Sequence, residues 1–495
     1  MTAASDQVIY GHLAALAREM AATLARLSRS PLIADDAAFA IGIVDRERRL
    51  VIQEQGEPSH LYAVREATRA LMDYFAYDVA EGDVFIVADP FCGGTHAHLI
   101  SVARPVFWKG QLEYVITCRV PLLDLAGELP GALQPFAFEV WQEAYRVTPL
   151  RLHRAGAAQR DVVRFLTVNS RAPLSLGAEL DAVLAVGRQG ERSLHTLMRH
   201  YGVPEMTSAA TTSLTYSSKR LMGHLQSLLP RDGFARRSVR GPDGSAVTIE
   251  VRLGWRAPRV RLDFTGCSAA VSSSMNATAQ LTRAAASIPL LAGVLDDVPL
   301  NDGVLEMFHA VLPDDSAVNA KPPAASSLSV PVTAHVIAAA VAAAARDAGA
   351  SSEDVARVHG LAPSAILYSP VGTTDANTPL YLSPGFPVNV PGTGGPALHG
   401  RRRMASAEEL EARHGLAIVS REMSEAGTMI VDVLNVGAAR EATLVALGPL
   451  DDSGAPPRLE LTGAARQNVA GGVAVAKVPS GAHLVFHYPA PRGAS

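Results

Sequence analysis

The sequence predicts an α+β protein, a large subunit of two lobes in which blocks of helix and blocks of strand follow one another. Apolar residues recur at helical spacing over residues 8–27 and again over 159–228. Short apolar runs bounded by turn residues lie within 83–118 and 246–264, as expected for strands. The chain has 495 residues, which is more than one small core can organise.

The first part of the chain alternates between helix and strand signals. We expect Ser5 to cap a helix that runs to about Leu27, and Ser59 to open a second helix that reaches Phe75. Residues 38–53 predict a β-hairpin. Further strands are expected at 83–89, 101–108 and 112–118, the last two joined by a tight Lys109-Gly110 turn.

The remainder predicts further blocks of the same kind, with Ser326–Ser329 expected to cap the last helix and 370–404 expected to form a long loop. The expected helices are 159–168, 177–201, 207–228, 277–293 and 331–347, and the expected strands are 246–253, 259–264, 416–420, 428–433 and several within 456–490. We therefore expect three units, an N-terminal lobe 1–205, a second α/β lobe 206–450 and a C-terminal β tail 451–495.

Composition excludes several classes of protein. Hydrophobic residues at 48% and charged residues at 19% are typical of a folded globular chain. The formal net charge is −4 and no basic stripe carries interleaved aromatic residues, so no nucleic-acid partner is expected. The best membrane candidate, 330–345, is short and contains Pro331 and His335, which favours a buried helix and no membrane partner. Three cysteines without a paired pattern and the lack of a signal-peptide pattern predict a cytoplasmic protein.

The segment Asp89-Pro-Phe-Cys-Gly-Gly-Thr-His-Ala-His98 attracts attention as a candidate site. It follows an apolar strand directly, and more sheet is expected on both sides. A rigid strand aims a loop of this kind, which is why binding and catalytic residues often occupy such positions. Two glycines permit a sharp turn, and a cysteine, a threonine and two histidines lie within a few residues of each other.

This loop and other motifs in the same order resemble the hydantoinase B family. That family is related to the C-terminal half of ATP-dependent oxoprolinase and to a subunit of acetone and acetophenone carboxylases. The resemblance is strongest over residues 5–350. It is carried by Pro58-Ser-His-Leu61, Gly82-Asp-Val84, Ala88-Asp-Pro-Phe-Cys-Gly-Gly-Thr-His96, the Gln142-Glu143 segment that ends in Pro149-Leu-Arg-Leu152, Asn169-x-Arg171-x-Pro173, the helix 176–202, Asp263-Phe-Thr-Gly266 and Pro299-x-Asn301-x-Gly303.

The resemblance implies a divalent zinc or manganese ion held by two histidines and one aspartate, but the ligand pattern is only partly present. His96 matches the histidine of the family's Thr-His-Leu-Pro-Asp element. The aspartate of that element is replaced by Leu99. The family's His-His-Ala-Asp segment aligns with Pro121-Leu-Leu-Asp124, so that both histidines are lost and only Asp124 remains. One imidazole cannot hold a catalytic metal, so this pattern indicates a degenerate metal site.

Two interpretations of the loop remain open. In an extended segment His96 and His98 would face the same side, and with Asp124 they could form a rearranged metal site, to which Cys92 or Cys118 could add a softer ligand. Alternatively the loop is a former site, in which both histidines make ordinary hydrogen bonds. Substrate-lining roles are expected for four polar residues of the matched motifs, namely Asp89, Thr95, Gln142 and Glu143.

The resemblance also implies partner subunits. Family members work with a hydantoinase A-type subunit that carries the ATP-binding machinery, and this sequence contains no Walker loop, so ATP is expected only through that partner. The first hypothesis is therefore a B-type subunit of an ATP-dependent cyclic-amide hydrolase or ketone carboxylase, with doubtful catalytic competence of its own. The alternative is a non-catalytic structural or regulatory paralogue that accompanies a second, intact B-type subunit.

Overall fold

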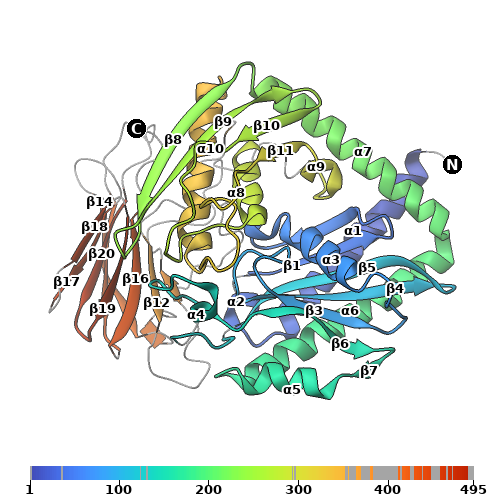
Figure 1. Ribbon diagram of the computed structural model, residues 1–495, viewed down its shortest axis with the longest axis horizontal. Coiled ribbons are helices and arrows are strands. Elements are labelled where there is room, and N and C mark those ends of the chain that lie inside the picture. Colours follow the sequence, from blue (N-terminus) through green and yellow to red (C-terminus); the bar gives the residue numbers. More distant parts are fainter. Residues whose placement is uncertain are drawn as a thin grey trace.

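The computed structural model confirms the α+β class, with three sheets and the helices that cover them (Figure 1). The structure describes residues 3–34, 37–122, 124–129, 132–291, 294, 297–351, 355, 364–368, 380–382, 408, 411–412, 415–423, 429–437, 439–446, 458–463, 467–470 and 472–488. The loop expected at 370–404 lies outside the described residues apart from 380–382.

The elements fall close to the predicted ranges. The helices are α1 (Ala3–Leu27), α2 (Pro31–Ala34), α3 (Ala63–Tyr74), α4 (Val140–Glu143), α5 (Arg160–Val168), α6 (Pro173–Tyr201), α7 (Val203–Leu228), α8 (Ala279–Leu291), α9 (Asp302–Leu305) and α10 (Ala334–Asp347). The strands of the first 311 residues are β1 (Ala40–Asp45), β2 (Leu50–Gln55), β3 (Val84–Ala88), β4 (Leu99–Trp108), β5 (Gln111–Pro121), β6 (Val147–Arg154), β7 (Ala157–Ala158), β8 (Gly233–Arg240), β9 (Ala246–Arg256), β10 (Arg259–Asp263) and β11 (Phe308–Val311).

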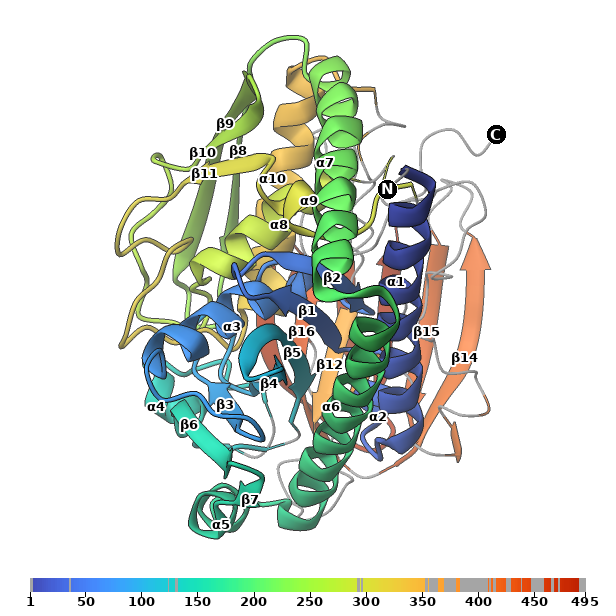
Figure 2. The same ribbon diagram turned by 90° about the vertical axis from the view of Figure 1, so that its right-hand side faces the viewer.

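The N-terminal sheet has seven strands in the order β2-β1-β5-β4-β3-β6-β7. Helices α1 and α6 cover one face and α3 covers the other. Its central strands are buried on both faces, which explains their continuous apolar runs. Gly190 lets α6 approach, because a Cβ there would lie 2.7 Å from the side chains of Ile116 and Met20. Figure 2 shows α1 lying beside α6 and α7.

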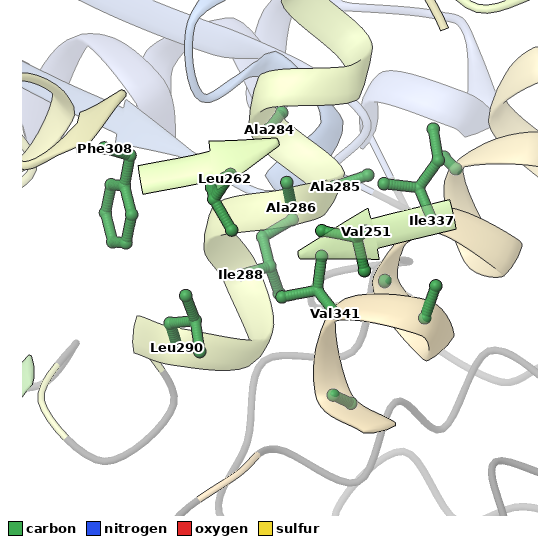
Figure 3. Close-up of a cluster of buried hydrophobic side chains, with 14 of the residues drawn as sticks. Val251, Leu262, Ala284, Ala285, Ala286, Ile288, Leu290, Phe308, Ile337 and Val341 are labelled. Atoms are coloured by element: carbon green, nitrogen blue, oxygen red, sulfur yellow. The ribbon is translucent and has the colours of Figure 1, made fainter. Parts of the chain in front are cut away.

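The second sheet has eight strands in the order β11-β10-β9-β8-β19-β16-β12-β13. Helix α10 packs against β8 and β9, and α8 packs against α10 and contacts β11. Figure 3 shows this core, in which Val251 and Leu262 of the sheet meet Ile288 of α8 and Ile337 and Val341 of α10. Helix α10 with the turn before it, Ser329–Asp347, is long and apolar enough to span a membrane, but 89% of that stretch is buried inside the protein, as expected of a core helix.

The last part of the chain supplies strands to two sheets. These strands are β12 (Ser364–Tyr368), β13 (Leu380–Leu382), β14 (Leu416–Met423), β15 (Met429–Asn435), β16 (Arg440–Ala446), β17 (Arg458–Thr462), β18 (Gln467–Ala470), β19 (Gly472–Val478) and β20 (His483–Tyr488). The third sheet has the order β14-β15-β20-β17-β18, and it shares a hydrophobic core with β16 and β19 of the second sheet. Residues 451–495 therefore contribute to the same sheets as residues of 206–450.

Three predicted helix starts are wrong. Helix α1 already includes Ser5, and α3 begins at Ala63 after a short 3₁₀ turn over Pro58–His60. The π-helical turn Ser329–Thr333 precedes α10, and no side chain caps either helix at this end. In the last two cases serine hydroxyls bond elsewhere: Ser59 Oγ donates to the neighbouring Glu57 at 2.8 Å, and Ser327 Oγ donates to the distant Gln134 carbonyl at 3.1 Å.

Candidate functional site

The loop 89–98 joins β3 to β4 and is held close to two helices. Gly93 adopts φ +79°, and a Cβ there would lie 2.4 Å from the backbone nitrogen of Ala67 in α3. The carbonyl of Gly94 accepts a hydrogen bond of 2.8 Å from Thr278 Oγ1, just before α8. Only glycine fits the first position, and the loop is thereby placed between the N-terminal sheet and the helices of the second lobe.

Asp89, at the start of the loop, is buried and forms an ion pair. Its carboxylate accepts hydrogen bonds from the Arg146 guanidinium, the shorter at 2.6 Å, and from the backbone nitrogen of Phe91 at 3.0 Å. The guanidinium also lies 5.6 Å from the ring centre of Phe91 and 5.8 Å from that of Trp141. These contacts give Asp89 a role in fixing the loop, whereas its predicted substrate-lining role stays a prediction.

Thr95 lies in a buried polar cluster centred on Arg119 of β5. The guanidinium of Arg119 donates to Thr95 Oγ1 at 2.9 Å, to Ser101 Oγ at 2.9 Å and to His60 Nδ1 at 3.1 Å. Arg119 is 1% exposed, and burial lowers its pKa to about 9. Burial, with the nearby charge of Arg119, also lowers the pKa of His60 well below its usual value, so this imidazole is neutral at pH 7.

His98 uses both ring nitrogens within the protein. The backbone nitrogen of Leu125 donates to His98 Nδ1 at 3.3 Å, so the ring proton resides on Nε2 and is donated to the Glu143 carbonyl at 2.9 Å. Burial lowers the pKa of His98 and keeps the ring neutral. An imidazole in this arrangement has no lone pair to offer a metal. Instead, His98 links the loop to Leu125 and to Glu143.

Asp124 is likewise occupied by contacts inside the protein. Its carboxylate accepts hydrogen bonds from the backbone nitrogen of Ala126 at 2.8 Å and from Arg171 Nη1 at 3.0 Å. The charge of Asp124 acts on His98, so the structure brings these two predicted residues into one neighbourhood. Arg171 belongs to the Asn-x-Arg-x-Pro motif and anchors the 124–129 turn, because its Nη2 also donates to the Gly127 carbonyl at 2.6 Å.

His96 differs from the other polar residues of the loop. Within the described part of the chain, no hydrogen bond or ion pair engages its ring. The side chain keeps part of its surface accessible, whereas Thr95 and His98 on either side are buried. Burial of the ring and the neighbouring His98 and Arg119 lower the pKa of His96 to about 3. It is therefore a neutral, available imidazole at pH 7.

Gln142 and Glu143 have different structural roles. Gln142 closes a capping box at the start of α4, where its Oε1 accepts from the backbone nitrogens of Phe138 and Glu139. Glu143 is fully buried, and its carboxylate accepts from the backbone nitrogens of Ser326 at 2.7 Å and Ser327 at 2.5 Å. Burial raises the pKa of Glu143 to about 7. Both contacts are internal, and a substrate-lining role for either residue stays a prediction.

The three cysteines do not provide a nucleophile. All are free thiols, and burial raises the pKa of Cys92 to about 11, that of Cys118 to about 12 and that of Cys267 to about 11. A thiolate is the reactive form of cysteine, and these values leave each side chain protonated at pH 7. Hydrogen bonding and charge, rather than covalent catalysis by sulfur, are what this site can supply.

The residues at the loop do not fit a catalytic metal ion. Among the residues that the structure describes, no three His, Cys, Asp or Glu side chains converge into a metal-binding group. His98 has no open lone pair, Asp124 is paired with Arg171, and the buried Leu99 stands where the resemblance places a carboxylate. Zinc or manganese bound by His96, His98 and Asp124 stays a prediction, which this geometry does not favour.

Sequence reasoning missed the central residue of the site. Arg119 lies in the strand Gln111–Pro121, and a signal for it was present, because a lone arginine in the apolar run YVITCRVP has to be buried with its partners. His60 was quoted only as part of a motif, and its contact with Arg119 joins residues 59 positions apart. No pattern in a single sequence reveals that pairing.

Comparisons with known proteins identify the family and the fold of the chain. The family model of hydantoinase B/oxoprolinase matches residues 4–425. Caprolactamase subunit beta of Pseudomonas jessenii is 32% identical over 227 residues, which is 46% of this chain and 39% of that protein. The chain spans between 24% and 57% of the length of the curated relatives it matches first.

Two solved structures share the fold. The ATP-dependent caprolactamase from Pseudomonas jessenii aligns with a TM-score of 0.80 at 20% identity, covering 99% of this chain and 90% of that one. A nucleotide-free acetone carboxylase aligns with a TM-score of 0.77 at 13% identity, covering 98% of this chain and 74% of that one. Because the family model covers most of the sequence, the chain belongs to the hydantoinase B/oxoprolinase family.

Proposed function

We propose that this chain is the B-type subunit of an ATP-dependent complex that opens a cyclic amide. The observation that carries the proposal is the identity of 32% to caprolactamase subunit beta over 227 residues, within a family match that spans residues 4–425. Other relatives are 5-oxoprolinases, whose name also denotes a cyclic amide substrate. Ketone carboxylation is the neighbouring possibility, supported by the likeness to acetone carboxylase.

ATP use is proposed to come from a partner. The sequence has no Walker loop, and the two solved structures that share the fold come from work on enzymes described as ATP-dependent. A hydantoinase A-type subunit would bind ATP and activate the amide or ketone oxygen by phosphorylation. The B-type chain would then hold the activated substrate beside the loop 89–98.

What this chain can contribute chemically follows from the states of its groups. His96, with a pKa of about 3, is a poor proton acceptor at pH 7 but can hydrogen-bond to a substrate as a neutral imidazole. Arg119 supplies a fixed positive charge in a region from which most water is excluded, where charge stabilisation is strongest. The side chains therefore support binding and electrostatic stabilisation, and no metal-dependent step is assigned to them.

A second candidate function is a non-catalytic structural or regulatory subunit that accompanies an intact B-type chain. The specific observation in its favour is that both predicted ligands already have partners inside the protein. His98 bonds to Glu143 and Leu125, and Asp124 bonds to Arg171. A catalytic subunit would need such groups free to face the substrate. The chain could thus assemble with an A-type subunit without taking part in the reaction.

The test uses the purified chain, first alone and then together with the A-type subunit that is encoded beside it. The same two preparations are made with a His96→Ala variant for comparison. Ring opening of caprolactam, 5-oxoproline and hydantoin is followed by ADP release, and zinc and manganese are measured by mass spectrometry. ATP-dependent turnover that requires both chains and falls at least tenfold in the variant would support the first function. A stable complex whose turnover ignores His96→Ala would favour the second, and stoichiometric metal lost in the variant would mean a rebuilt metal site.

A further inference from the structure

The buried guanidinium of Arg119 is the starting point. Each of its three nitrogens donates one hydrogen bond, to His60 Nδ1, Ser101 Oγ and Thr95 Oγ1. All three acceptors are uncharged, and two of the five guanidinium N–H groups make no further bond to the residues that the structure describes. A charge held only by neutral acceptors is incompletely compensated.

No carboxylate within the described residues lies within ion-pair distance of Arg119. The buried Arg65 and Arg104, by contrast, each form an ion pair, with Asp302 and Glu191. Glu57 is the carboxylate whose charge acts on Arg119 from further away, and its side chain accepts from Ser59 Oγ at 2.8 Å. Buried arginines normally pair with a carboxylate or a phosphate, because leaving the charge alone in a low-dielectric interior is costly.

Each of the two imidazoles beside Arg119 has at least one ring nitrogen without a hydrogen bond in the described structure. His60 is 0% exposed, and its Nε2 forms no hydrogen bond, although the Ala38 carbonyl acts on the ring. His96 has no hydrogen bond at either nitrogen in the described structure, and its partly accessible surface provides the route to solvent. Arg119 donates to His60 and to Thr95, the residue directly before His96. The charge of Arg119 acts on both imidazoles, so the three groups belong to one cluster.

This cluster attracts an anion and repels a cation. A metal ion at His60 and His96 would lie near the positive charge of Arg119, and like charges in a buried site destabilise each other. A small anion would instead complete the guanidinium's charge and accept N–H groups from the imidazoles. The chemistry of the donors therefore points to an oxyanion.

We propose that His60, His96 and Arg119 form a binding site for a small oxyanion, either a carboxylate or a phosphate, beneath the loop 89–98. The site does not depend on the chain's being catalytic, and it goes beyond the function proposed above. The shared ligand chemistry has two sources. One is the carboxylate of a substrate or product, and the other is a phosphoryl group released by an ATP-dependent partner.

The test is titration calorimetry of the full chain with sodium phosphate and, separately, with sodium acetate, at constant ionic strength in a non-coordinating buffer. We expect saturable binding of one anion per chain, with each anion weakening the apparent affinity for the other. Tighter binding of phosphate would indicate the phosphoryl source, and tighter binding of acetate would indicate the carboxylate source. Absence of saturable binding of both anions to the folded chain would overturn the proposal.

Variants locate the site. Arg119→Gln should weaken binding at least tenfold, and Arg119→Lys, which keeps the charge, should weaken it less. Arg236→Gln removes an exposed arginine from β8 as the matched control and should change affinity less than twofold. Equal loss in the control would show only general attraction to surface charge. Equal loss in both Arg119 variants, with circular dichroism showing that both are folded, would contradict a role for the buried charge.

Discussion

The two histidines of one loop lie in opposite kinds of environment. On one side, His98 and Glu143 form a buried polar cluster in which the hydrogen-bonding groups find partners within the protein, including the backbone of Leu125, Ser326 and Ser327. On the other side, His96 has no hydrogen bond in the described structure, His60 Nε2 has none, and Arg119 has only neutral acceptors.

The difference separates framework from function. Buried polar groups that are fully satisfied stabilise the fold and are expensive to remove. Groups left unsatisfied in an otherwise well-paired protein cost stability and are therefore candidates for binding. Replacing His98 should therefore lower stability, whereas replacing His96, only two residues away, should weaken binding.

The largest loss of stability is expected at Glu143, and a small measured loss there would break this comparison. Glu143→Ala removes the acceptor for the backbone nitrogens of Ser326 and Ser327 and should lower the free energy of unfolding by about 3 kcal/mol, since each buried N–H group left unsatisfied costs about 1–3 kcal/mol. Urea denaturation followed by circular dichroism measures it. Glu143→Gln keeps an acceptor oxygen and should lose much less, and Glu81→Ala, at an exposed position, should lose almost nothing.

A second prediction uses pH. The pKa of Glu143 is about 7 in the folded chain against an ordinary value of 4.5, so between these values the folded state binds more protons than the unfolded state. The contribution of Glu143 to stability should therefore be lost as pH rises from about 4.5 to about 7, by on the order of 2 kcal/mol. Subtracting the unfolding profile of Glu143→Gln isolates this slope. A difference that is flat over that range would show that Glu143 is ionised normally.

The two histidines provide the sharpest pair. His98→Ala leaves the Glu143 carbonyl and the Leu125 amide without partners and should lower the free energy of unfolding by about 2 kcal/mol. His96→Ala breaks no hydrogen bond and should change it by about 0.5 kcal/mol or less. Thermal and urea unfolding of both variants measure this contrast. Equal destabilisation would mean that His96 has a packing role and would remove the basis of the comparison.

A smaller loss of stability than at Glu143 or His98 is expected at the start of α4. Gln142→Ala opens the capping box over Phe138 and Glu139 and should cost about 1 kcal/mol, because caps contribute about that much. The measurement is again the midpoint of urea unfolding. ADP release by the complex should be unchanged, since the side chain of Gln142 is engaged within its own segment. A turnover defect without a stability defect would instead support the predicted substrate-lining role.

Much of the fold could be predicted from the sequence because its patterns are local. The strands around 84–88 and 99–121 are continuous apolar runs, and Lys109-Gly110 forms the expected turn with both residues at positive φ. Helix α6 ends at Tyr201, and Gly202 directly after it has a φ of +90°, which favours glycine. Hydrophobic periodicity and turn residues act over short distances, so one sequence contains them.

The candidate site was predicted less well because it depends on contacts between distant residues. The loop itself was identified, and so were His96 and His98, but nothing local distinguishes a histidine with two partners from one with none. Ser326 and Ser327 were assigned to a helix cap, whereas they serve as partners of Glu143, 183 and 184 positions away. Such pairings arise only when the sheets and helices are assembled.

The strand order of the second sheet has a consequence for how this chain is made. Strand β8 is joined to β16 and β12 only through β19, which begins at Gly472, more than 230 residues after β8 ends. During synthesis, the edge of β8 that faces β19 therefore lacks this neighbour until residue 472 has been made. An exposed edge is a template for pairing with other chains. We therefore expect β8 to be a segment through which the nascent protein can pair with other chains before β19 has been made.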